Sequence, residues 1–168
     1  LVLTTLHTND AVSTVSRLLD MGAAPYLLAS SINAVLAQRL VRRICAHCVR
    51  DDELSGAARA WVSARGAATE GYKRGEGCHQ CNNTGYRGRL GVYEMLEFDT
   101  AMGQALASGD LAGFTRLARA SRGLRPLPLA ALDFALAGHT TVAEAMRIAA
   151  DDLQSDGGID DLADARAA

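Results

Sequence analysis

Two cysteine pairs of identical spacing constrain this chain more than any other feature. Cys45 and Cys48 are separated by two residues, as are Cys78 and Cys81, and 29 residues (49–77) lie between the pairs. Two intervening residues let both thiolates of a pair turn toward one ion, and two such pairs complete a tetrahedral site of four sulfurs. Because a closed site leaves no position for a substrate, the spacing predicts a structural Zn²⁺ ion.

Two other interpretations of the cysteines stay open at this point. The four thiols could form two disulfides, or they could remain unliganded. The separation between the pairs is longer than is usual for paired zinc-binding motifs, whereas the repeated spacing within each pair favours metal. His47 and His79 lie inside the pairs and could each replace a cysteine, but four sulfurs already fill the shell.

Composition narrows the class of fold and the class of partner. About half of the residues are apolar (49%) and only 5% are aromatic, with alanine and leucine dominant, which favours helices over an all-β sandwich. The net charge of −2 suggests no broad electrostatic surface for nucleic acid, so we expect no nucleic-acid partner. No apolar run approaches the roughly 18 to 20 residues that a membrane-spanning helix needs.

Residues 1–43 have the pattern of half a βαβ unit. The first six are apolar or β-branched, as in a buried parallel strand, and Thr8, Asn9 and Asp10 offer N-caps for a helix that ends near Gly22. A second helix is predicted from Pro25 to about residue 43. Its predicted apolar stripe comprises Leu28, Ile32, Val35, Leu36 and Leu40, and its predicted polar face ends in Gln38, Arg39, Arg42 and Arg43.

The rest of the chain divides into three further segments. Residues 44–89 lack periodicity and contain no large apolar set, so we expect metal to hold them in place. Residues 90–152 are predicted to form a strand at 90–96 followed by helices, and residues 153–168 a disordered tail. The predicted helices are 100–108, 110–121, 127–137 and 142–152, the last with a capping box from Thr141 to Glu144.

A histidine stands where ligands bind in open α/β sheets. Thr5 and His7 come at the end of the predicted strand 1–6, directly before a helix. Ligands lie outside such strand ends, and a helix N-terminus there favours anions. His7 could therefore donate a hydrogen bond to a phosphate oxygen. A lone histidine in a turn is, by position only, more often a cap or a surface residue.

Five segments, taken in order, resemble the ATPases of type II secretion and type IV pilus assembly. The first is similar to the histidine box of that family, and the others follow the family's order through its last helix. The segments are 5–9, 36–42, the two cysteine pairs, 85–94 and 138–147.

The resemblance implies an α/β fold, namely the second half of a RecA-like P-loop NTPase domain with a four-cysteine zinc-binding excursion and a helical C-terminal cluster. It implies a homo-hexameric motor that hydrolyses ATP with Mg²⁺ and acts on an inner-membrane platform protein. Such a motor is cytoplasmic and peripheral to the bacterial inner membrane. His7 would sense the γ-phosphate, with Thr5, Gln38 and Arg39 near the nucleotide, although Gln38 and Arg39 could instead make structural hydrogen bonds.

The chain departs from the family in lacking its phosphate-binding machinery. The Gly-x-x-x-x-Gly-Lys-Ser/Thr loop, the aspartate box and the Walker B acid lie upstream of the histidine box in that family, and none occurs here. We therefore expect a piece of a longer protein that is inactive as an ATPase on its own. The motifs do not distinguish secretion from pilus assembly.

Two other classes of function stay open. One is a zinc-stabilised protein-interaction module without nucleotide chemistry, since residues 78–86 faintly resemble the cysteine repeats of zinc chaperones. The other is a zinc-ribbon nucleic-acid binder, for which Tyr86, Arg87 and Arg89 provide basic and aromatic neighbours. The net charge and the few aromatics argue against the second class.

Overall fold

The computed structural model describes residues 1–156, which fall into two compact units. Unit 1 comprises residues 1–38 and 93–126, and unit 2 comprises residues 39–92 together with the chain from residue 127 onward. The segments predicted from the sequence (1–43, 44–89, 90–152 and 153–168) are contiguous, whereas each unit combines two separate stretches. The protein is an α/β chain, as the composition and periodicity predict.

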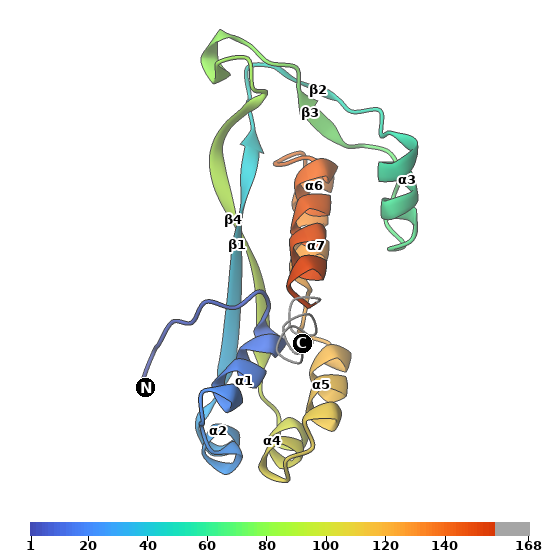
Figure 1. The fold of residues 1–168 in the computed structure, drawn as a ribbon. Helices are drawn as coiled ribbons and strands as arrows, with labels where there is room; N and C mark the ends of the chain where they lie inside the picture. The colour runs from blue at the N-terminus through green and yellow to red at the C-terminus, as the bar shows by residue number, and fades with distance from the viewer. Residues whose placement is uncertain (157–168) are drawn as a thin grey trace, which may run out of the picture. The chain divides into compact units, whose positions relative to one another are not determined.

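Unit 1 is built mainly from helices (Figure 1). Helix α4 packs against α2 and α5, and α1 packs against α5. Phe114, Met102 and Leu106 are buried between them, and the rings of Phe98 and Phe114 lie 5.5 Å apart. The helices are α1 (Ala11–Asp20), α2 (Pro25–Ser31), α4 (Thr100–Ala107) and α5 (Leu111–Ala120).

Aspartates begin three of these helices. The carboxylates of Asp10, Asp99 and Asp110 accept the backbone N–H three residues further on, at 2.6, 2.8 and 2.8 Å. Each satisfies an amide that has no partner within its own helix. The first amide of α1, that of Ala11, donates to the buried carboxylate of Glu94 at 2.9 Å. A carboxylate at this end also complements the partial positive charge of the helix.

Strands β1 (Ala34–Ile44) and β4 (Tyr86–Glu97) pair in a two-stranded sheet and contribute residues to both units (Figure 1). Hydrogen bonds at the two ends, from Phe98 N to Asn33 O and from Cys45 N to Gly85 O, are each 3.0 Å and show that the strands are antiparallel. Side chains alternate along β4, so that Val92, Glu94 and Leu96 are buried and those between them are exposed.

Unit 2 carries the second pair of strands and three helices. Helix α6 packs against α7, and α3 also packs against α7. Strands β2 and β3 pair antiparallel, with Arg50 opposite Arg74. A short 3₁₀ turn, His79–Cys81, belongs to the second cysteine pair. The other elements are β2 (Val49–Asp51), α3 (Gly56–Ser63), β3 (Lys73–Gly75), α6 (Leu127–Leu136) and α7 (Val142–Asp156).

The predicted N-terminal strand is wrong. Residues 1–8 have no regular secondary structure, and Leu1, Val2 and Leu3 are exposed. A parallel strand exists only when neighbouring strands satisfy its amides and carbonyls, and within residues 1–156 no strand pairs with this segment. The N-cap prediction for the following helix is confirmed at Asp10.

The second predicted helix is wrong beyond its first two turns. Helix α2 ends at Ser31, and Gln38 and Arg39 lie on strand β1 instead. Leu36 and Leu40, which were assigned to an apolar helical stripe, are 60% and 49% exposed on the strand. Because residues 34–44 pair with β4 as a strand, their side chains alternate between two faces instead of following the helical spacing of the sequence.

Most of the C-terminal predictions are confirmed. The strand at 90–96 lies within β4, and the predicted helices correspond to α4, α5, α6 and α7. Helix α7 continues through residue 156, and the remainder of the predicted disordered tail (157–168) lies outside the described residues. The expectation that residues 44–89 lack a core is wrong in part, because Leu54, Val62 and Tyr72 are buried.

Candidate metal centre and its surroundings

The four cysteines converge at one point in unit 2. All four sulfurs lie within 4.8 Å of one another. The separations of Sγ atoms are 3.9 Å for Cys45 and Cys78, 3.9 Å for Cys48 and Cys81, and 3.8 Å for Cys78 and Cys81. Four sulfurs placed about 2.3 Å from one ion at the corners of a tetrahedron are about 3.8 Å apart. The cluster therefore has the dimensions and the donor set of a tetrathiolate metal site.

The four cysteines do not form disulfides. The four cysteines are free, and the sulfur separations are far longer than the bond length of about 2.05 Å. His47 and His79 are exposed and do not belong to the group of residues that could share an ion. The prediction that four sulfurs fill the shell without a histidine agrees with this arrangement.

Backbone amides in the second cysteine pair point at a sulfur. The N–H groups of Cys78 and Gly85 donate to Cys81 Sγ at 3.2 and 3.3 Å. Asn82 and Asn83, which follow the pair, adopt left-handed conformations with φ of 51° and 60°. This turn brings the amide of Gly85 back onto the sulfur. Such hydrogen bonds stabilise a thiolate and orient it toward an ion.

Two glycines allow the chain to close tightly behind the cysteines. A side chain at Gly75 would overlap the carbonyl group of Gly85. At Gly77, φ is +99°, and a Cβ would lie 2.7 Å from the carbonyl oxygen of Asn83. Gly75 is therefore required because the backbone of Gly85 approaches closely. Gly77 is required both by its backbone conformation and by the lack of space for a side chain.

The surroundings shift the pKa values of two of the thiols in opposite directions. Burial opposes ionisation of Cys81, but hydrogen bonds from the amides of Cys78 and Gly85 and from the thiols of Cys78 and Cys48 together outweigh it and lower the pKa of the Cys81 thiol to about 6. Burial raises the pKa of Cys48 to about 11, in spite of an amide hydrogen bond from Gly77. The hydrogen bonds to Cys81 thus favour the form of the side chain that binds metal.

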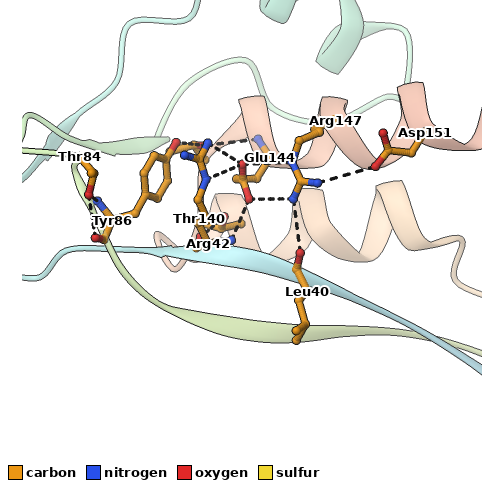
Figure 2. A network of polar contacts seen from close by, with 9 residues as sticks. Leu40, Arg42, Thr84, Tyr86, Thr140, Glu144, Arg147 and Asp151 are labelled. Carbon is orange, nitrogen blue, oxygen red and sulfur yellow. Dashed lines mark hydrogen bonds and ion pairs between the residues drawn. The ribbon is translucent and has the colours of Figure 1, made fainter. Parts of the chain in front are cut away.

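A second polar cluster lies in unit 2 around Glu144, whose side chain is only 1% exposed (Figure 2). Arg42 donates to Oε1 of Glu144 from Nε at 3.0 Å and from Nη2 at 2.9 Å, and its backbone N–H donates to Oε2 at 2.8 Å. Arg147 donates to Oε2 from Nη2 at 3.1 Å. Burial opposes ionisation, but these hydrogen bonds outweigh it and hold the pKa of Glu144 below its ordinary value.

Tyr86, the first residue of β4, is also part of this cluster. The guanidinium carbon of Arg42 lies 4.0 Å from the centre of the Tyr86 ring, and the Tyr86 hydroxyl shares a 2.9 Å hydrogen bond with Thr141 Oγ1. Figure 2 shows the ring beside the Arg42 guanidinium. The hydroxyl of Thr140 donates to the carbonyl of Arg42 at 2.7 Å. A cation over an aromatic face is a favourable pair, and more so when partly desolvated.

The cluster was not predicted, and two interpretations of its members are corrected. Arg42 was assigned to the polar end of a helix, but it lies on β1 and binds a buried carboxylate. Thr141 accepts the N–H of Glu144 at 3.3 Å, as in a capping box, whereas the Glu144 side chain turns to the arginines. The sequence signal for this cluster was a glutamate between apolar residues of a predicted helix. Its partner Arg42 could not be identified from the local sequence, because the two residues are 102 positions apart.

The residues predicted to lie near a nucleotide fall on two elements. Thr5 and His7 are exposed in the segment before α1, and its neighbour Thr8 shares a 2.7 Å hydrogen bond with Thr14 of α1. Gln38 is exposed and Arg39 partly buried on β1. The structure therefore brings together the four cysteines, while the roles of these four residues remain predictions. No helix among residues 1–156 is both long and apolar enough to cross a membrane.

Comparison with known proteins finds similarity to one family and to its members. Residues 1–147 match the family described as Type II/IV secretion system protein. The chain is 42% identical over 151 residues to Type II secretion system protein HxcR of Pseudomonas aeruginosa, covering 90% of this chain and 29% of that protein. It is 40% identical over 155 residues to Type II secretion system protein E of Aeromonas hydrophila, covering 90% of this chain and 30% of that protein.

A relative from pilus assembly is similar to nearly the same degree. The chain is 37% identical over 150 residues to Type IV pilus assembly ATPase TfpB of Acinetobacter baylyi, covering 88% of this chain and 26% of that protein. The chain thus spans less than a third of the length of these relatives.

Proposed function

The chain belongs to the type II/IV secretion system protein family, and on that premise we propose that it is part of a motor ATPase that powers type II secretion or type IV pilus assembly. The observation that carries this proposal is identity of 37 to 42% across about nine tenths of the chain with proteins of both systems, one of which is named an ATPase. The resemblance of residues 5–9 to the family's histidine box supports a role for this chain in the nucleotide chemistry of the longer protein.

The role proposed for the four cysteines is to hold a structural Zn²⁺ ion. Four thiolates are soft donors that favour Zn²⁺ over hard ions such as Mg²⁺ and Ca²⁺, and the sulfur separations fit its tetrahedral geometry. With all four positions taken by protein sulfurs, the ion would provide folding free energy and no catalysis.

The role proposed for His7 is to contact the terminal phosphate of ATP, with Mg²⁺ and the phosphate-binding loop supplied by sequence outside this chain. His7 is exposed directly before a capped helix, which leaves its imidazole accessible to a ligand. Thr5, Gln38 and Arg39 are assigned to the surroundings of the nucleotide by resemblance only. We expect the 168-residue chain by itself to hydrolyse no ATP.

The assembly proposed for the longer protein follows from the same resemblance. It is a homo-hexamer that works in the cytoplasm, at the inner membrane, on a platform protein of the secretion or pilus machine. We propose no nucleic-acid partner, since the net charge of −2 provides no general attraction to phosphates.

A chimaera tests the proposal. Residues 1–150 of this chain would replace the matching part of the Acinetobacter baylyi ATPase, and ATP hydrolysis and pilus formation would be measured. We expect turnover in the chimaera and a loss of at least about tenfold in kcat for His7→Ala, since a lost contact to transition-state charge costs that or more. His139→Ala, which is outside the histidine box, is the matched control. A folded chimaera without ATPase activity would favour an interaction module without nucleotide chemistry.

A further inference from the structure

Residues close in sequence to each cysteine pair are hydrogen-bonded to the loop between α6 and α7. Ile44, which precedes Cys45, donates its N–H to the carbonyl of His139 at 2.9 Å. Tyr86 lies five residues after Cys81, and its hydroxyl bonds Thr141 Oγ1 at 2.9 Å. The two pairs and this loop therefore form one connected structure within unit 2.

Gly85 joins the two cysteine pairs at the residue before Tyr86. Its N–H donates to Cys81 Sγ at 3.3 Å, and its carbonyl accepts the N–H of Cys45 at 3.0 Å. The hydroxyl of Thr84 donates to the carbonyl of Cys81 at 2.6 Å. Any separation of the cysteine pairs must break one of these bonds or move the backbone of Tyr86.

Tyr86 also contacts the arginine that binds the buried carboxylate of Glu144 in α7. Its ring lies under the guanidinium of Arg42, which binds Glu144 through two nitrogens (Figure 2). Since Glu144 is almost fully buried, its charge depends on the arginines being held in place. The position of the Tyr86 ring thus affects how well the carboxylate is neutralised.

We propose that metal binding by the four cysteines and the docking of α6 and α7 against residues 40–44 stabilise one another, with Tyr86 as the positioning residue. The inference rests on the metal site of the proposed function. Without an ion, the sulfurs keep only weak thiol contacts of 3.8 to 3.9 Å, and the two pairs are held together mainly by the hydrogen bonds of Gly85. By thermodynamic linkage, docking of α7 strengthens metal binding by the same factor by which metal binding strengthens docking, so a change that undocks α7 weakens metal affinity by up to that factor.

Hydrogen exchange on the full 168-residue chain tests the first direction. Backbone amides of residues 144–151 in α7 would be compared with Zn²⁺ bound and after chelation. We expect chelation to speed their exchange on the order of tenfold, a common size for coupling between two sites. Exchange in α4 and α5, which belong to unit 1, should change much less.

Variants of two tyrosines on β4 show whether Tyr86 carries the effect. Tyr86→Phe removes only the hydroxyl, and Tyr86→Leu also removes the aromatic face, so the metal dependence of α7 exchange should shrink in that order. Tyr93→Phe and Tyr93→Leu are the controls, because Tyr93 is half exposed on the same strand. Equal effects at the two positions would overturn the role of Tyr86.

Competition for Zn²⁺ against a coloured chelator tests the reverse direction. Glu144→Gln should weaken metal affinity on the order of tenfold while the variant still binds one ion per chain. A wild-type chain that binds one ion but shows unchanged α7 exchange on chelation would overturn the coupling and leave the zinc proposal intact. Equal loss of protection in α4, α5 and α7 would also overturn it. A chain that takes up no metal would overturn both.

Discussion

Arg42 and Glu144 lie 102 residues apart in the sequence, yet Arg42 Nη2 is 2.9 Å from Glu144 Oε1, and the carboxylate side chain is 1% exposed. The pair joins strand β1 to helix α7 within unit 2. Arg147 and the backbone N–H of Arg42 share the same carboxylate. Glu144 is therefore the buried acceptor at the centre of this polar cluster, and its removal has consequences that can be measured.

Glu144→Gln should destabilise the chain by about 2 kcal/mol, because a buried carboxylate that accepts hydrogen bonds from two half-exposed arginines becomes a neutral amide. Arg42→Ala should cost less, since Arg42 is 53% exposed and Arg147 still binds the carboxylate. Urea unfolding of metal-loaded protein measures both. Glu97→Gln is the matched control, as Glu97 is exposed on β4. A loss below about 0.5 kcal/mol for Glu144→Gln, the size of an ordinary surface change, would contradict this account.

The stability of the chain should also depend on pH through Glu144. Because hydrogen bonds hold its folded pKa below the ordinary 4.5, its contribution is complete above that pH and is lost as the pH falls through the lower folded pKa. Melting temperatures of wild type and Glu144→Gln, compared in the same metal state from pH 7 to pH 3, should converge at the acid end. A constant difference between the two proteins at every pH would show that the charge of Glu144 is not involved.

Loss of one cysteine should abolish the metal site, whereas loss of a neighbouring histidine should not. Purified protein should contain about one Zn²⁺ per chain, and Cys81→Ser should contain far less, because three thiolates leave an incomplete shell. His47→Ala and His79→Ala should keep the metal, since both histidines are exposed outside the sulfur cluster. Elemental analysis and thiol titration before and after chelation provide the measurement. Equal metal loss in Cys81→Ser and His47→Ala would point to a mixed site.

A series of glycine substitutions separates backbone conformation from space. Gly71→Ala should cost about 1 kcal/mol, because its φ of +88° disfavours a side chain although nothing lies within 4 Å. Gly77→Ala should cost more and lower metal retention, since its Cβ would also lie 2.7 Å from Asn83 O. Gly56→Ala, at an open position with ordinary φ, should be nearly neutral. Thermal melting with metal analysis ranks the three, and the same cost at Gly71 and Gly77 would exclude the steric term.

The candidate metal site could be predicted because the placement of the cysteines within each pair depends on local spacing. Two residues between cysteines place both sulfurs on one side of a turn whatever the rest of the fold does. Helices α4, α5 and α7 could be predicted for a similar reason, since their N-terminal caps are local. Asp99 and Asp110, for example, lie directly before the helices that they cap.

Strand β1 and the Arg42–Glu144 pair depend instead on partners distant in sequence. Leu36 and Leu40 are four residues apart, which matches a helical face, and only pairing with β4 places them in a strand. The same pairing decides where Arg42 points. Local periodicity contains no information on that choice, because the free energy that decides it comes from hydrogen bonds and burial against residues 86–97.

The alternation of the two units along the chain has a consequence for synthesis. Residues 39–92 of unit 2 leave the ribosome before residues 93–126, which complete unit 1, and helices α6 and α7 follow last. All four cysteines are therefore available to an ion while each unit still lacks its second half. An ion captured then would tie residues 45 and 81 together and shorten the loop that β1 and β4 must later close. With the proposed Zn²⁺ site, the supply of metal during translation, as well as afterwards, would affect the yield of folded protein.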